Sequence, residues 1–98
     1  MAKFRINYPK VISQANTMSE QSNDLSREIA ILENVLNDVR NDWKGPASEA
    51  YQSQLLTLIS SMKKTKNRMS NVSATIKNVA TRIKQEDERA AQMAEKLR

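Results

Sequence analysis

Near its midpoint, the 98-residue chain contains the stretch Asn41-Asp42-Trp43-Lys44-Gly45-Pro46, which decides the fold. This stretch holds the only tryptophan and the only glycine of the sequence. Glycine can adopt a positive φ at a helix end, and proline suits the first turn of a helix, where its missing N–H is not needed. The sequence therefore predicts one domain of two helices, at about residues 8–42 and 47–95, joined by a turn at 43–46.

Apolar residues recur on both sides of this turn in alternating steps of four and three, the 3.5-residue repeat of helices that pack along a seam. In the first predicted helix, the repeat comprises Val11, Ala15, Met18, Ser22, Leu25, Ile29, Leu32, Leu36, Val39 and Trp43. In the second, it comprises Tyr51, Leu55, Leu58, Met62, Thr65, Met69, Val72, Ile76, Val79, Ile83, Glu86, Ala90, Met93 and Leu97.

The two repeats also predict how the helices pair. Antiparallel partners joined by a tight turn have residue numbers with a nearly constant sum, and pairs such as Leu32 with Leu58 and Ala15 with Ile76 satisfy this condition. The predicted fold is therefore an all-α antiparallel helical hairpin. In this register, the residues after about 84 have no partner in the first helix and form an overhang.

A second apolar edge is predicted beside the seam, and it consists of Ile31, Val35, Leu56 and Ile59. A two-helix hairpin has no third layer to cover such an edge. We therefore expect it to be a dimer interface through which two hairpins form a four-helix bundle. The alternative is that these residues only broaden the core of the hairpin.

The composition argues against catalysis. The chain has no cysteine and no histidine, so it lacks the residues of disulfides, most metal sites and most nucleophilic triads. Carboxylate pairs such as Asp24 with Glu28 would need a concave pocket to shift their pKa values, and a thin hairpin supplies none. We expect no enzyme activity, no catalytic residues, no metal and no cofactor.

The net charge of +5 is concentrated in the second half of the chain, where Lys63, Lys64, Lys66 and Arg68 cluster. Such a cluster could attract nucleic acid or an acidic membrane surface, and this function remains an alternative. No aromatic residue is interleaved with the cluster to stack on a base, so a solvated helix face is the simpler interpretation.

The sequence contains no apolar run of the roughly 20 residues that span a bilayer. Its start also lacks the apolar block and cleavage site of a signal peptide. Export of this protein would therefore need a pathway that uses no cleavable leader.

The Trp43-Lys44-Gly45 turn, with a small residue and Tyr51 after it, resembles the turn of the WXG family of small helical hairpins. The resemblance extends over residues 9–97. It implies a protein that is made in the bacterial cytoplasm and secreted by a type VII system as an effector or a chaperone-like partner. The implied partners are a second copy, a paralogous WXG-type or larger toxin-like protein, and the secretion ATPase. No small-molecule substrate or nucleic acid is implied.

Actinobacterial members of the family carry a C-terminal Tyr-x-x-x-Asp/Glu export signal, which this chain lacks, because its last tyrosine, Tyr51, is followed four residues later by Leu55. A related pattern of other Gram-positive members matches Ile83, Asp87, Ala90 and Ala94. We expect these four residues to form an export or partner segment, with a solvated helix end as the alternative. The competing function is an intracellular adaptor that acts through its coiled-coil seam.

Overall fold

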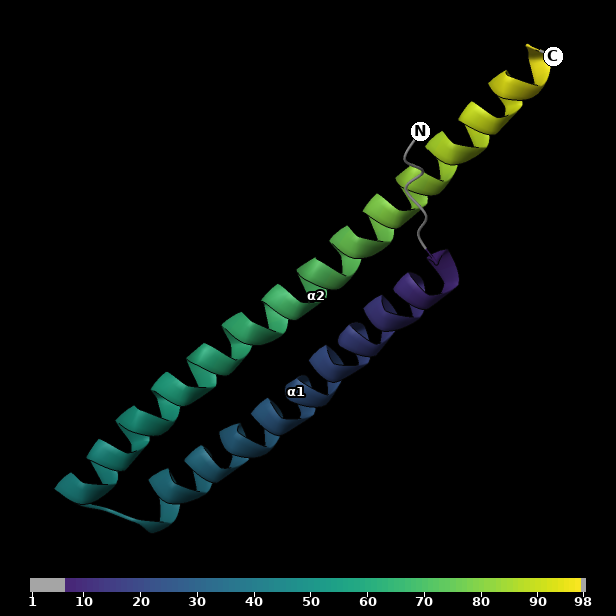
Figure 1. Cartoon of the computed structure of the whole chain (residues 1–98). Coiled ribbons are helices and arrows are strands. Elements are labelled where there is room, and N and C mark those ends of the chain that lie inside the picture. Colours follow the sequence, from purple (N-terminus) through teal and green to yellow (C-terminus); the bar gives the residue numbers. More distant parts are fainter. Residues whose placement is uncertain (1–6, 98) are drawn as a thin grey trace.

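A computed structural model describes residues 7–97, which form two helices, α1 (Tyr8–Asp42) and α2 (Pro46–Lys96). The helices run antiparallel as a thin hairpin, and the extents of the molecule are 80 × 17 × 15 Å (Figure 1). The all-α helical hairpin predicted from the sequence is confirmed. α2 is the longer helix and continues past the start of α1, at the end of the molecule opposite the turn (Figure 1). We call this end the open end.

The helix ends follow from local chemistry. The Asn7 side chain accepts a hydrogen bond from the Lys10 backbone N–H at 3.1 Å, which caps α1, and Pro9 lies in its first turn. At the turn, Gly45 has a φ of 115° and precedes Pro46, the first residue of α2. The buried Ser48 hydroxyl donates to the Trp43 carbonyl at 2.7 Å and so ties α2 to the end of α1.

Gly45→Ala is expected to lower the free energy of unfolding by about 1–3 kcal/mol, because the backbone conformation at this position is open almost only to glycine. No atom lies within 4 Å of a Cβ built on Gly45, so the cost is conformational and not steric. Urea melts followed by circular dichroism measure the effect. The exposed neighbour Lys44→Ala is the control, and equal losses in the two variants would contradict the role of the positive φ.

The core lies in the half of the hairpin nearest the turn. Ile29 and Leu36 of α1 pack with Leu55 and Ile59 of α2, and half-buried residues surround them. Toward the open end, the buried positions are instead small: Ala15, Ser22, Ser73 and Ala80. The apolar burial that stabilises the hairpin is therefore greatest near the turn.

Serine side chains fix the register at the open half. The Ser73 hydroxyl donates to the Ala15 carbonyl at 2.6 Å, and the Ser22 hydroxyl donates to the Lys66 carbonyl at 3.0 Å. A serine can reach the backbone of the opposite helix only where small residues let the helices approach closely. The carbonyls of α1 point toward the turn, so Ser73 reaches the Ala15 carbonyl from the turn side of Ile76, the residue that the sequence predicted opposite Ala15. Leu36 still packs with Leu55, as predicted.

The structure corrects half of the predicted seam of α2, because a neighbouring row of the helix is buried in its place. Leu55 is buried and Met62, Met69, Ile76 and Ile83 are half-buried, as predicted, but Leu58, Val72 and Val79 are exposed. The positions one residue later, Ile59, Ser73 and Ala80, are buried in their place. Ile59 is only 4% exposed, so its assignment to an exposed edge was wrong. The physical reason is that the close approach at Ala15 and Ser22 favours small side chains opposite them.

Candidate interaction surfaces

Four exposed apolar or aromatic residues of α2, with a threonine between them, form a row along one side of the helix. We call this row the α2 stripe, and it consists of Tyr51, Leu58, Thr65, Val72 and Val79. Each member immediately precedes a residue that is buried or half-buried against α1, so it lies about 100° around the helix from the seam. Leu58 is 49% exposed and Val79 is 50% exposed, so large apolar side chains stand uncovered along the hairpin.

The equivalent row of α1 is mostly polar. Gln14, Gln21, Glu28 and Val35 each precede a buried residue of α1, and all four are exposed. Because the helices are antiparallel, this row lies on the same side of the hairpin as the α2 stripe. Ile31, also exposed, lies beside Val35. This side of the hairpin is therefore apolar along α2 and polar along most of α1.

The four residues predicted as a dimer interface do not form one patch. Ile31 and Val35 are exposed on the side of the α2 stripe, whereas Ile59 lies in the core. Leu56 lies on the same side of α2 as Lys63, one heptad later, and the Lys63 amine is 3.8 Å from the Glu33 carboxylate, so Leu56 and Glu33 share one side of the hairpin. Ile31 is two residues before Glu33, which places it about 200° around α1. Ile31 and Leu56 therefore lie on opposite sides of the hairpin.

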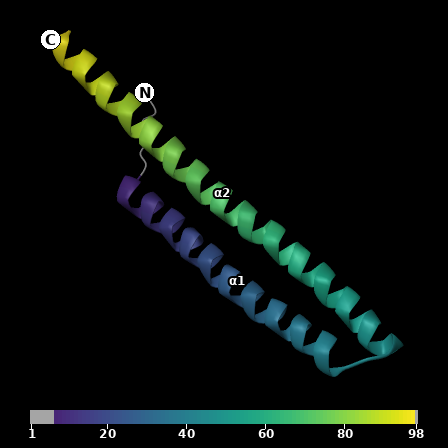
Figure 2. The same cartoon turned by 180° about the vertical axis from the view of Figure 1, so that it is seen from behind.

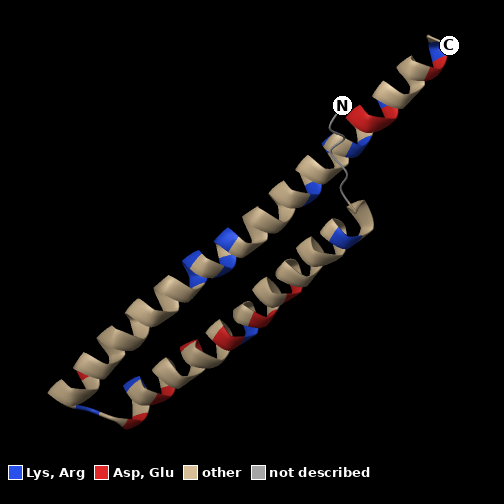
Figure 3. Cartoon of the chain, viewed as in Figure 1, with Lys and Arg blue, Asp and Glu red and all other residues tan. Residues whose placement is uncertain are grey.

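Apart from the exposed Leu56, the side opposite the α2 stripe is polar and mostly basic along α2. Lys63, Lys77 and Lys84 follow Leu56 along α2 at heptad spacing. Figure 3 shows that acidic residues are spread along α1, whereas basic residues dominate the part of α2 that lies beside it. The exposed Glu33–Lys63 pair contributes little to stability, since such pairs are worth about 0–1 kcal/mol.

At the turn, the Trp43 ring lies 5.9 Å from the Tyr51 ring, measured between centroids. Trp43 is 45% exposed, so it does not fill the end of the core as the predicted seam required. The two rings instead form an aromatic pair at the turn end of the α2 stripe. Gly45 and Trp43 therefore have different roles here, because the glycine shapes the turn while the tryptophan extends an apolar surface.

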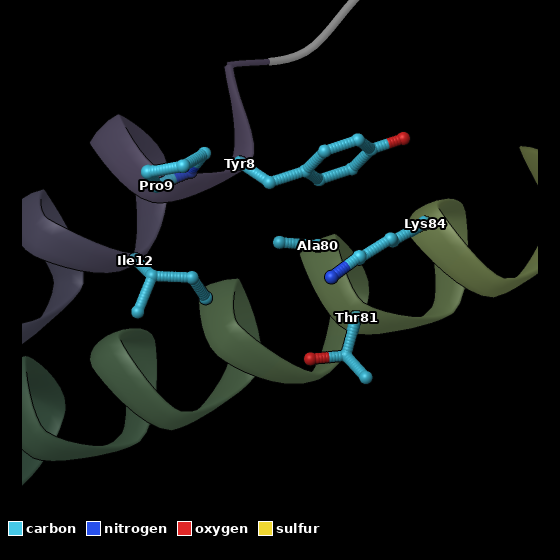
Figure 4. A pocket seen from close by; sticks show the side chains of 6 residues that line it. All are labelled: Tyr8, Pro9, Ile12, Ala80, Thr81 and Lys84. Atoms are coloured by element: carbon cyan, nitrogen blue, oxygen red, sulfur yellow. The ribbon is translucent and has the colours of Figure 1, made fainter.

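At the open end, the Tyr8 hydroxyl donates a hydrogen bond to the Asp87 carboxylate and joins the two helices. Beside this contact lies an open groove of about 520 Å³, shown in Figure 4. The lining residues are Tyr8, Pro9, Ile12, Ala80, Thr81 and Lys84. The hydrogen bond to Asp87 raises the pKa of Tyr8 to about 12, with partial desolvation and the charges of Asp87 and Glu88 acting in the same direction.

The raised pKa of Tyr8 makes the contact measurable. In a Tyr51→Phe background, Tyr8 is the only tyrosine, and its phenolate absorbance is expected to appear near pH 12 and not near the ordinary value of about 10. Because the folded pKa is the higher one, the stabilising effect of the contact is complete below pH 10 and is lost between about pH 10 and 12. Asp87→Asn is the control and should return the titration toward 10, and an unchanged titration would contradict the contact.

The predicted export segment spans the point where α1 ends its contact with α2. Ile83 is half-buried and Asp87 binds Tyr8, while Ala90 and Ala94 are exposed. Every described residue after Ile83 is exposed. The first half of the segment is thus held by α1, and the second half projects as a single helix.

Other kinds of site are missing from the described part of the chain. Residues 7–97 contain no group of three or more acidic residues placed to hold a metal ion. Neither α1 nor α2 combines the length and apolarity that a membrane-spanning helix requires. The surfaces that remain are the α2 stripe, the basic side and the open end.

Comparisons with known proteins agree with this architecture. A crystal structure of EsxA from Geobacillus thermodenitrificans is similar in fold, with a TM-score of 0.78 and 22% sequence identity, over 91% of this chain and 99% of that one. No curated protein matches the chain significantly. The model of the WXG100 family, described as proteins of 100 residues with WXG, matches residues 3–88. With the Trp43-x-Gly45 turn between its two helices, this chain belongs to the WXG100 family.

Proposed function

We propose that this WXG100 protein is a substrate of a type VII secretion system, which leaves the bacterial cell without a cleavable leader and acts as an effector or as the chaperone-like partner of a co-secreted protein. The observation that carries the proposal is the Trp43-x-Gly45 turn between two helices that leave the α2 stripe uncovered. The match to the family over residues 3–88 supports it.

The proposal includes pairing with a second helical hairpin. Burying apolar surface contributes about 25 cal/mol per Å², and side chains such as Leu58 and Val79 are about half exposed in the single hairpin. A partner hairpin that covers the α2 stripe would complete a four-helix bundle with a continuous core. Pairing would therefore cover a row of apolar side chains that the single hairpin leaves about half exposed to water.

The proposal also assigns recognition by the secretion ATPase to the segment of Ile83, Asp87, Ala90 and Ala94. The exposed part of this segment lies beyond the contact between Tyr8 and Asp87 and packs against no other helix. A single helix with one apolar edge can be gripped in a groove of a partner, and its recognition need not open the hairpin.

The test is export from a producing strain with and without its type VII secretion ATPase. The protein is expected in the culture supernatant of the parent strain and inside the cells of the strain that lacks the ATPase, with a cytoplasmic enzyme as the marker for lysis. Equal retention in both strains would contradict export and favour the intracellular adaptor.

A further inference from the structure

We propose that residues 1–6, which we call the N-terminal arm, bind along the part of α2 that projects past the start of α1. The arm lies outside the described residues and joins α1 at Asn7, the residue that caps this helix. Its docking surface is the side of the projecting helix that continues the contact with α1. This inference goes beyond the proposed function and does not rest on it, because it concerns how the chain covers its own open end.

The docking surface begins where the contact with α1 ends. Asp87 accepts the hydrogen bond from Tyr8, so its side chain lies on the side of α2 that faces α1. At about 100° per residue, Ala90, Ala91 and Ala94 lie on the same side of the helix as Asp87, and all three are exposed. Figure 2 shows α2 continuing past the start of α1, with no other described segment beside it. We call this side of the projecting helix the alanine face.

The length of the arm matches the length of the alanine face. An extended chain advances about 3.3 Å per residue and a helix about 1.5 Å, so each residue of an extended arm passes about two residues of α2. Tyr8 lies level with residues 84–87 of α2, since it lines a groove with the first of them and binds the last. Counting back from Tyr8 places the two large side chains next to it in the arm beside exposed alanines: Ile6 beside Ala90, and Phe4 beside Ala94.

The sequence pattern of the arm also fits the alanine face. In an extended chain, alternate side chains point to opposite sides, so Phe4 and Ile6 share one side while Lys3 and Arg5 share the other. Small alanine side chains let an extended backbone approach the helix closely, so the two apolar side chains of the arm can be covered. Phe4 is expected to contribute most to docking, because an aromatic ring buries a large apolar area.

The charges of the two surfaces are complementary. The acidic residues of α2 after Glu49 all belong to its projecting part, and Figure 3 shows them gathered at that end: Glu86, Asp87, Glu88 and Glu95. Each lies within about 100° of Asp87 around the helix, whereas Arg89 and Lys96 lie about 180–200° from it, on the back of α2. Glu86 is paired with Arg89 at 3.3 Å, which leaves two glutamates beside the alanine face. The arm carries two basic residues and no acidic one, so its charge favours the alanine face over the back of the helix.

The groove of Figure 4 is the alternative docking site for the arm. It lies between the first turns of α1 and Ala80 of α2, on the turn side of Tyr8. An arm that entered it would have to reverse its direction at Asn7. The lining residues of the groove include Lys84 and no acidic residue, so the groove would repel the basic arm. The alanine face is therefore the better site.

NMR relaxation of the full-length chain tests docking without any substitution. Backbone order parameters of residues 3–6 are expected to exceed about 0.6, the upper limit for a flexible backbone, and lower values would overturn the proposal. Replacing both Glu88→Gln and Glu95→Gln should lower these order parameters, because it removes the acids beside the alanine face. The matched control is Glu20→Gln with Glu28→Gln, which removes the same charge from α1. Equal order parameters in the two double variants would overturn the assignment to the alanine face.

Pairs of cysteines locate the arm, because the chain contains no cysteine of its own. Ile6→Cys with Ala90→Cys is expected to form a disulfide within one chain under mild oxidation of dilute protein, since a disulfide requires Cα atoms within about 7 Å. Ile6→Cys with Arg89→Cys is the control, because Arg89 lies at almost the same level but toward the back of α2. Its disulfide should form at least about tenfold more slowly, as measured by mass spectrometry of the monomer.

A third pair tests the groove. Ile6→Cys with Thr81→Cys should close more slowly than the pair with Ala90→Cys, because Thr81 lines the groove and not the alanine face. Faster closure of the groove pair, or equal rates for the Ala90 and Arg89 pairs, would overturn the proposal. Circular dichroism checks that each variant stays helical. All of these measurements use the purified chain, so their failure would leave the proposed function, which is tested by export, unaffected.

Discussion

Ile59→Ala is expected to lower the free energy of unfolding by about 2–5 kcal/mol, the range for deleting a large aliphatic side chain from a packed core. Ile59 is 4% exposed and packs with Ile29, Leu36 and Leu55. The hairpin consists of only two helices, and its fully buried cluster of large side chains is small, so little material is available to refill the space. The effect should therefore be large for a hairpin of this size.

The adjacent residue supplies the control. Leu58 is about half exposed, so Leu58→Ala removes little core and should affect the single hairpin weakly. If the α2 stripe pairs two copies, the cost of Leu58→Ala depends on protein concentration, because pairing stabilises the folded state by mass action. The cost of Ile59→Ala does not. Urea melts by circular dichroism at several protein concentrations separate the two, and equal effects at every concentration would contradict the assignment of core and stripe.

The sequence determined the fold through two signals that survive in the structure. One is the Gly45-Pro46 turn, where a positive φ meets the first residue of α2. The other is the 3.5-residue repeat on either side of the turn. Both are local properties of the chain, so they can be identified from the sequence without knowledge of the tertiary contacts.

The face of α2 that packs against α1 could not be predicted in the same way. Two heptad rows of α2 satisfy the repeat equally well, one through Leu58 and Val72 and the other through Ile59 and Ser73. Hydrophobicity favours the first row, but the structure buries the second because Ser73 binds the Ala15 carbonyl across the interface. The choice between them depends on the opposite helix, which is tertiary information. In the sequence, the small residues Ala15 and Ser22 at seam positions of α1 were the signal that the two helices approach each other closely there.

The dependence on tertiary contacts also explains why the sequence predicted the overhang at the open end but not the contact that lies beside it. The overhang was predicted, since α2 is longer than α1, but the hydrogen bond from Tyr8 to Asp87 joins residues that are 79 positions apart. No local pattern connects them. The contact depends on the register and on where α1 begins, and both follow from packing. The interface residues were displaced for the same reason, because a change of one position moves a side chain about 100° around the helix.

Removal of residues 86–98 is expected to leave the hairpin folded and to abolish export. Every described residue of this stretch is exposed, and its only hydrogen bond to α1 is the one that Asp87 accepts from Tyr8. A segment with so little buried surface contributes little to folding, so the melt should stay within about 1 kcal/mol of wild type. The loss of export should instead be nearly complete, because the truncation removes the acid and both exposed alanines of the proposed recognition segment.

Two further variants separate the parts of this segment. A shorter truncation that removes residues 89–98 keeps the contact between Tyr8 and Asp87 but deletes Ala90 and Ala94, whereas Asp87→Ala keeps the helix and deletes the acid. If the ATPase recognises the projecting helix, the 89–98 truncation should lose export. If it recognises the acid, Asp87→Ala should lose export. The measurement is the ratio of extracellular to cellular protein, with a melt of each variant. If the truncation that removes residues 86–98 is stable and is secreted normally, this segment has no export role. If that truncation unfolds, the end of α2 must pack against a second hairpin, and its contribution to folding is larger than the single hairpin indicates.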